Sequence, residues 1–163
     1  MFEDLLKENK NKFRQIWQIH IHHSWKPNYD DFNGHNHIDL YYQIKNWHVK
    51  HNGWSDIGYH FLVFPDGHIL KGRSLLRTPA SIRGHNRGAV AVCMIGNFDI
   101  DDITKEQYRN TIILTAEVKK MYDVPLDKIY FHRDWNSHKT CPGLLLLKEP
   151  FIEDLQKYLK KEM

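Results

Sequence analysis

The spacing of apolar residues along the chain predicts strands that alternate with helices. Residues 16–22, IWQIHIH, alternate with a period of two, so Ile19 and Ile21 occupy one side of a predicted strand, and Gln18, His20 and His22 occupy the other. From about residue 38 to 50, a helix is predicted because Leu40, Ile44 and Trp47 recur at helical spacing. The stretch GYHFLVFPDGHILKGR predicts a β-hairpin, because its Pro-Asp-Gly turn separates two β-rich runs.

The second half of the chain continues this pattern. GAVAVCMIGNF predicts a buried strand, and KIYFHRD predicts a short strand that ends at His132. Thr104 followed by Gln107 has the spacing of a helix-capping box. Further helices are predicted over residues 148–162 and, near the N-terminus, over residues 2–13. Strands that alternate with helices predict an α/β fold with a central mixed β-sheet flanked by helices.

Length and composition are those of one globular domain over residues 1–163. Apolar residues make up 41% and charged residues 26%, which is ordinary for such a domain. The net charge of +3 suits an anionic target, such as a bacterial wall or a nucleic acid, without choosing between them. Two cysteines can form at most one disulfide, and synthesis in a reducing compartment is the simpler interpretation.

The N-terminal stretch MFEDLLKENKNKFRQIW is charged and lacks the continuous apolar run of a secretory signal peptide. No window of the sequence approaches the ~20 apolar residues that a membrane span needs. We therefore expect a protein that has no signal peptide and does not insert into a membrane.

Histidine is the unusual residue, with twelve copies in the chain. Two predicted strands end in histidine, at His22 and His23 and at His132, and the ends of strands are where α/β sheets usually place their sites. Cys141 lies nine positions after His132, beyond a turn that can bring it back toward the strand. Because His and Cys are preferred ligands of zinc, and a catalytic zinc keeps one position open, these residues predict a catalytic zinc site.

Spacing alone leaves the ligand set open. His20, His22 and His23 all lie on the first predicted strand, whose end favours the last two, and His138 is not excluded. A thiol beside His132 is also compatible with cysteine-based catalysis, and such a pair can occur without any chemistry. The sequence contains no CxxC pair typical of structural zinc, and no HExxH, GxSxG, GxGxxG or Walker motif.

Four stretches, in order, resemble a known family. They are IHIHHSW, GWSDIGYHFLVFPDGHILKGR, PASIRGHNRGAVAVCMIGNFD and FHRDWNSHKTCPG, and together they cover about residues 16–145. The sequence resembles the zinc-dependent N-acetylmuramoyl-L-alanine amidases of the peptidoglycan recognition protein (PGRP) and T7 lysozyme type. Four ordered motifs are far more specific than any one of them.

The resemblance implies the fold of that family and a Zn²⁺ ion held by His22, His132 and Cys141. The first His of the paired HH is the ligand in the family. Tyr59 in GYHF matches the family's catalytic Tyr, and Lys139, two residues before the Cys, matches its transition-state Lys. The Cys favours activity, because non-catalytic recognition proteins commonly lose it.

The resemblance also implies the reaction, which is hydrolysis of the amide bond between N-acetylmuramic acid and L-alanine of peptidoglycan. Without a signal peptide, such an enzyme would be a phage or prophage endolysin, stored in the host cytoplasm and released to the cell wall through a holin. The alternative is a non-catalytic peptidoglycan-binding or regulatory module of the same fold. Bacterial peptidoglycan is the expected partner, and a nucleic acid is not.

The sequence departs from the family's pattern in HHSWKP, where many relatives have a Thr and small residues after the histidines. Trp25 is therefore expected to shape a different substrate rim. His85 and Asn86, in the Gly-bracketed stretch RGHNRG, are further candidates for substrate contacts. His60 alternates with Tyr59 along its strand and is interpreted as structural.

Overall fold

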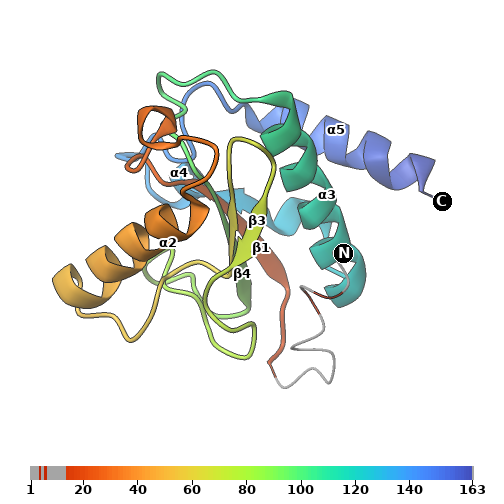
Figure 1. The fold of residues 1–163 in the computed structure, drawn as a ribbon. Helices are drawn as coiled ribbons and strands as arrows, with labels where there is room; N and C mark the ends of the chain where they lie inside the picture. The colour runs from red at the N-terminus through yellow and green to blue at the C-terminus, as the bar shows by residue number, and fades with distance from the viewer. Residues whose placement is uncertain (1–3, 5, 7–13, 163) are drawn as a thin grey trace.

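The structure is a computed structural model that describes residues 4, 6 and 14–162. The predicted helix at residues 2–13 falls almost entirely outside these residues and stays a prediction. The described part contains a five-stranded sheet with helices on both faces (Figure 1). This arrangement confirms the predicted α/β fold with a mixed sheet.

The sheet has the strand order β3-β2-β4-β1-β5. Its strands are β1 (Gln18–His23), β2 (Phe61–Val63), β3 (Ile69–Lys71), β4 (Ala89–Met94) and β5 (Ile129–Phe131). Strands β2, β4, β1 and β5 pair in parallel, and only β3 is antiparallel to its neighbour, β2. The carboxyl ends of four strands therefore meet at one edge of the sheet.

Helix α2 (His37–Asn46) lies on one side of the sheet, and α3 (Lys105–Tyr122) and α5 (Lys148–Lys161) lie on the other (Figure 1). A π-helical turn, Trp47–His51, extends α2, and the short helix α4 (His132–Trp135) follows β5 directly. Short 3-10 turns occur at Tyr29–Asp31 and Leu126–Lys128. No helix in the described ranges combines the length and the apolar character needed to cross a membrane.

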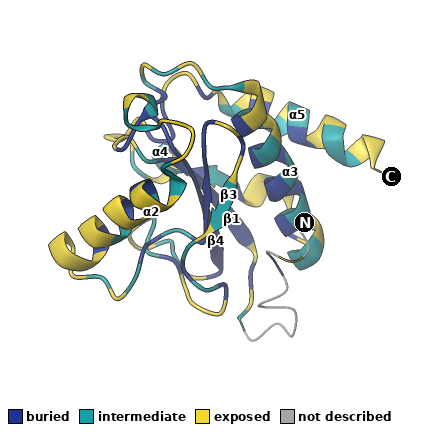
Figure 2. Cartoon of the chain, in the orientation of Figure 1, coloured by how far each residue is buried: buried dark blue, intermediate teal, exposed yellow. Residues whose placement is uncertain are grey.

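Each face of the sheet has its own core (Figure 2). The larger core, beneath α3 and α5, includes Ile19 and Ile21 of β1, as their alternation predicted. The smaller core joins α2, through Leu40 and Ile44, to the other face. Since both faces are covered, all six residues of β1 are buried, and histidines share the strand with isoleucines.

The predicted capping box is only half formed. The Thr104 side chain accepts a hydrogen bond from the Gln107 backbone N–H at 3.2 Å, as predicted. The Gln107 amide instead donates to the carbonyl oxygens of Val63 and Ile95, at 2.8 Å each. The side chain thus ties α3 to the sheet, which satisfies two buried carbonyls and leaves the helix with a one-sided cap.

The end of α2 differs from the prediction as well. Trp47 was expected on the apolar side of the helix, but its side chain is 57% exposed and stacks on His51. His48 points inward instead, and its Nδ1 accepts the backbone N–H of Gly58 at 3.0 Å. Burial, followed by the charge of Arg73, lowers the pKa of His48 to about 4.

These contacts predict a pH-dependent stability. His48 is neutral in the fold but titrates near 6.5 when unfolded, so its stabilising effect is complete above pH 6.5 and is lost as the pH falls toward 4. His48→Asn keeps an acceptor for Gly58 without a titrating ring. We expect wild type to lose about 2 kcal/mol more than this variant between pH 6.5 and 5, in urea unfolding. Parallel losses in both proteins would contradict this assignment.

Candidate metal centre and active site

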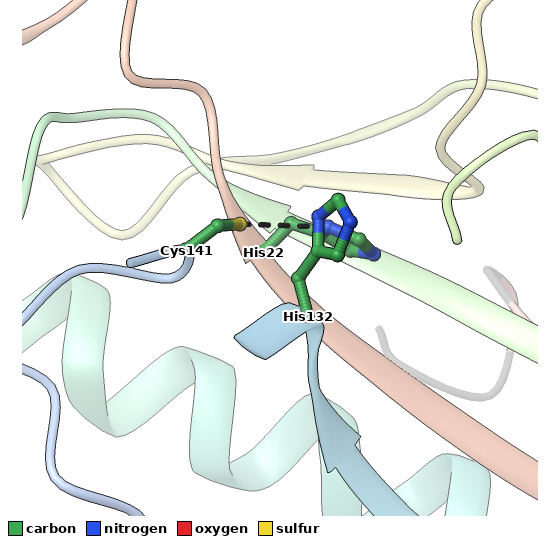
Figure 3. A group of neighbouring side chains, drawn as sticks. All are labelled: His22, His132 and Cys141. Atoms are coloured by element: carbon green, nitrogen blue, oxygen red, sulfur yellow. Dashed lines mark hydrogen bonds between the residues drawn. The ribbon is translucent and has the colours of Figure 1, made fainter. Parts of the chain in front are cut away.

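Three side chains converge at the edge where the parallel strands end. His22 lies near the end of β1, His132 begins α4 directly after β5, and Cys141 lies in the loop beyond α4 (Figure 3). Their potential ligand atoms all lie within 4.8 Å of one another, and they form the one such His/Cys/Asp/Glu cluster found among the described residues. The grouping arises because β1 and β5 are parallel neighbours in the sheet.

The spacing of these atoms suits a shared metal ion. The Cys141 Sγ lies 3.6 Å from the Nδ1 of His22, and the rings of His22 and His132 are 5.0 Å apart at 71°. Tetrahedral bonds of ~2.3 Å to sulfur and ~2.0–2.1 Å to nitrogen would separate a sulfur and a nitrogen ligand by about 3.6 Å. The observed separation between the Cys141 Sγ and the His22 Nδ1 matches that value.

The protonation states fit a ligand role for the two histidines. Burial lowers the pKa of both His22 and His132, so their imidazoles are neutral and offer lone pairs. Burial raises the pKa of Cys141 to about 12, although Lys139 and Arg133 act in the opposite direction. Such a thiol keeps its proton until a cation displaces it, which does not favour cysteine-based nucleophilic catalysis.

The structure separates the histidines that spacing left open. His20 is engaged by Ser81 Oγ at 3.0 Å and by Gln18 Oε1 at 3.2 Å. His23 lies on the opposite face of β1, where its Nδ1 accepts the backbone N–H of Phe98 at 3.1 Å. His138 is exposed, at the edge of the hollow beside the cluster. Among the strand histidines, only His22 joins His132 and Cys141.

Arg133 holds the loop that carries Cys141. Its backbone N–H donates to the carbonyl oxygen of Cys141 at 2.9 Å. Its guanidinium donates to the carbonyl oxygens of Thr140, Gly143 and Leu146 at 3.2, 2.9 and 2.7 Å. Because Arg133 directly follows His132, this one residue joins the segments that supply His132 and Cys141.

Gly143 allows the same loop to pack closely. Its φ is +108°, and a Cβ atom there would lie 2.4 Å from the backbone carbonyl carbon of Phe98. Asp99 supports the loop from the same side, since its carboxylate accepts the Thr140 hydroxyl at 2.8 Å and the Leu144 backbone N–H at 3.0 Å. The loop is thus fixed on both sides of Cys141.

A hollow of about 480 Å³ opens beside the cluster. Tyr59 and Lys139 line it together with His132 and Cys141, and the Tyr59 ring lies 5.3 Å from that of His22. Burial and the neighbouring Cys93 and Cys141 raise the pKa of Tyr59 well above its ordinary value. The hollow therefore combines a protonated phenol, an exposed ammonium group and the three potential metal ligands.

A second hollow, of about 410 Å³, continues from the first toward α2. The two hollows share Ser24, Trp25 and Tyr59. Its far wall includes Ile44 and Trp47, so it is more apolar than the hollow at the cluster. An extended substrate can occupy both hollows at once.

Comparison with known proteins identifies the family. A family model described as N-acetylmuramoyl-L-alanine amidase matches residues 12–144. The chain is 30% identical over 123 residues to the endolysin of Enterobacteria phage K11, covering 72% of this chain and 73% of that protein. The chain belongs to the N-acetylmuramoyl-L-alanine amidase family.

Solved structures show the same fold. The N-acetylmuramoyl-L-alanine amidase LysC from Clostridium intestinale matches with a TM-score of 0.75 and 26% identity, over 88% of this chain and 87% of that one. A point mutant of Drosophila PGRP-LB in complex with tracheal cytotoxin matches with a TM-score of 0.74 and 27% identity, over 83% and 80% of the two chains. The fold of this amidase is therefore of the PGRP type, as the sequence motifs implied.

The donor set of this amidase fits the zinc ion that the family implies. The ligand atoms of two imidazoles and a thiol lie within 4.8 Å of one another, and the adjoining hollow offers space for a fourth ligand. The buried Nε2 of His22 has no hydrogen-bond partner in the described part of the chain. The ring's other nitrogen, Nδ1, faces the Cys141 Sγ at 3.6 Å and is the atom placed to bind an ion shared with Cys141.

The structure gives two of the predicted substrate contacts other partners. The Asn86 Oδ1 accepts the backbone N–H groups of Ser81 and Ile82, at 2.9 and 2.8 Å, and so shapes its own loop. The ring of His85 stacks on that of Trp135, with centroids 3.8 Å apart. Neither lines the two hollows, so a substrate role for His85 or Asn86 stays a prediction without support from these contacts.

Sequence reasoning missed Arg133 and Asp99, the residues that position the Cys141 loop. The hydrogen-bond acceptors of the Arg133 guanidinium are all backbone carbonyls, which no residue type marks in the sequence. The only local signal for Arg133 is that it directly follows a candidate ligand. His60 was interpreted as structural, and the structure agrees. Its ring is buried, bonding Arg77 O at 2.9 Å and accepting the Ala91 N–H at 3.0 Å.

We expect Arg133→Lys to loosen this loop. A lysine cannot reach three diverging carbonyls with one ammonium group, so the free energy of unfolding should fall by about 2 kcal/mol. Metal affinity should fall at least ~10-fold, as when a group that orients a ligand is removed. Urea unfolding of metal-free protein and titration with Zn²⁺ measure the two effects. The control Arg109→Lys alters an exposed site on α3, and equal effects of both variants would refute the clamp.

Proposed function

We propose that this amidase is a zinc-dependent hydrolase that acts as an endolysin and cleaves the bond between N-acetylmuramic acid and L-alanine in peptidoglycan. The observation that supports this most is the convergence of His22, His132 and Cys141 beside a hollow lined by Tyr59 and Lys139. A catalytic zinc site needs three protein ligands and one open position next to a substrate cleft. Bound zinc would polarise the scissile carbonyl and activate a water molecule.

Lys139 would stabilise the negative charge that develops on the scissile carbonyl oxygen. Its ammonium group is exposed at the hollow, two residues from Cys141, and its charge lowers the pKa of both His132 and Cys141. These effects place a positive potential at the ligand cluster. A positive charge at this point stabilises the transition state more than the uncharged substrate.

Tyr59 would orient the attacking water or give a proton to the leaving amine. Its raised pKa keeps the phenol protonated near neutral pH, so the side chain is a hydrogen-bond donor there. This environment favours donation over the alternative in which Tyr59 takes a proton from the water. Tyr59 lines both hollows and so lies beside a substrate that bridges them.

The endolysin assignment rests on relatives such as the phage K11 endolysin. On this proposal, the protein would be stored in the host cytoplasm, released through a holin and directed to the anionic cell wall, which its charge of +3 suits. The alternative is a peptidoglycan-binding or regulatory module. It draws support from PGRP-LB, which was solved in complex with tracheal cytotoxin.

Cys141→Ser separates the two functions. We expect this variant to lose bound Zn²⁺ and to release L-alanine amino termini from purified cell walls at least ~10²-fold more slowly, because an alcohol is a poor zinc ligand. Binding to intact walls should be nearly unchanged. Cys93→Ala removes the second thiol of the chain, which lies outside the ligand cluster, so this variant should keep its zinc content. New reducing sugar ends in place of amino termini would instead indicate a glycosidase.

Lys139→Gln tests the electrostatic role without touching the metal ligands. We expect kcat to fall ~10²–10³-fold, as when a transition-state donor is removed, while KM changes little and zinc content stays at one per chain. Lys128→Gln serves as a control with the same change of charge, because Lys128 lies just before β5, at the end of the strand opposite to His132. A fall in kcat below threefold would exclude Lys139 from transition-state stabilisation.

A further inference from the structure

Trp25 has a backbone conformation that its side chain disfavours. Its φ is +60°, in the left-handed region, where a bulky residue is a genuine outlier. Asp123 is the other described non-glycine residue with positive φ, and it ends α3, where that conformation is ordinary. The strain at Trp25 therefore has no explanation in helix capping.

The surrounding backbone holds Trp25 in this conformation. Its N–H donates to Gly96 O at 2.9 Å, and the Ser24 N–H donates to Met94 O at 3.0 Å. The Ser24 hydroxyl accepts the Gly96 N–H at 2.9 Å and donates to Pro27 O at 2.5 Å. These bonds continue the pairing of β1 with β4 and fix the strained residue, as observed for strain retained at functional sites.

Packing does not compensate for this strain. The Trp25 side chain is 63% exposed, and none of the described aromatic rings stacks on it. A tryptophan normally contributes to stability by burying a large apolar surface, which this one does not do. Strain combined with exposure indicates that the side chain is kept for contact with another molecule.

The position of Trp25 suggests what that molecule is. Trp25 lines both hollows, including the one that contains His132 and Cys141. In the proposed substrate, the scissile carbonyl belongs to the lactyl group, so only an ether oxygen and one carbon atom separate it from the muramic acid ring. The glycan is a continuous polymer and must remain at the surface, whereas the peptide can enter a hollow. The exposed ring beside the ligand cluster thus lies where a sugar must pass.

We propose that Trp25 is a specificity-determining platform on which the pyranose ring of N-acetylmuramic acid stacks while the scissile amide lies at the metal ligands. This inference rests on the proposed function for the identity of the sugar. The flat, CH-rich face of a pyranose matches a rigid indole, which offers a large contact area at a low cost in conformational entropy. The fixed backbone orients the ring before the sugar arrives.

The test compares two small acids that differ by the sugar ring. Zinc-loaded protein is titrated calorimetrically with N-acetylmuramic acid and with lactate, neither of which contains the scissile amide. Trp25→Asn removes the ring but tolerates the left-handed backbone, and Trp25→Phe keeps both ring and strain. We expect Trp25→Asn to weaken N-acetylmuramic acid binding about tenfold and leave lactate unchanged, with Trp25→Phe within about threefold of wild type.

Thermal unfolding of the same proteins distinguishes the platform from a structural role. Trp25→Asn should melt at the same or a higher temperature than wild type, because it relieves strain and loses little burial. The proposal would be overturned if Trp25→Asn melted at a lower temperature and lost equal affinity for both acids. It would also be overturned if all three proteins bound N-acetylmuramic acid with equal affinity, or if wild type did not bind it. Sugar-specific binding without release of L-alanine termini would refute the proposed function and leave the platform intact.

Discussion

The parallel pairing of β1 with β5 is the constraint on which the site depends. In this register Ile21 lies opposite Phe131, so the next residues along each strand, His22 and His132, reach the same edge as neighbours. A shift by one residue would turn His22 to the other face of the sheet, away from Tyr59 and the hollows. The apolar packing of Ile19, Ile21 and Phe131 beneath α3 and α5 therefore also fixes the geometry of the ligand cluster.

The histidines of β1 show how far local sequence could predict this site. The alternating pattern predicted a strand with His20 and His22 on one face, which the structure confirms. It could not show which one is a ligand, because their partners are distant in sequence: Ser81 for His20 and Cys141 for His22. Only the resemblance to a family selected His22, and the structure groups the same residue.

Other features could not be predicted from the sequence pattern, for a related physical reason. The role of Arg133 depends on backbone carbonyls, which every residue possesses, so its three acceptors leave no sequence signal. Asn86 resembles a surface loop residue, yet it organises the turn at Ser81. At the end of α2, a single position separates the exposed Trp47 from the buried His48, and spacing does not resolve such a small difference. Element types and the local Thr104 cap were predictable, whereas polar contacts between residues distant in sequence were not.

The site brings together two imidazoles and a thiol, which a bound cation would engage together. Burial lowers the pKa of His22 and keeps its imidazole neutral, whereas it raises the pKa of the Cys141 thiol to about 12, so a metal ion must displace the thiol proton as it binds. The thiol therefore makes metal binding depend on release of its proton, whereas the neutral imidazole offers a lone pair directly. Because a ligand that binds only the native state stabilises it, metal binding and folding are thermodynamically coupled here. Arg133 strengthens this coupling, since it keeps the Cys141 loop beside His132 before any ion arrives.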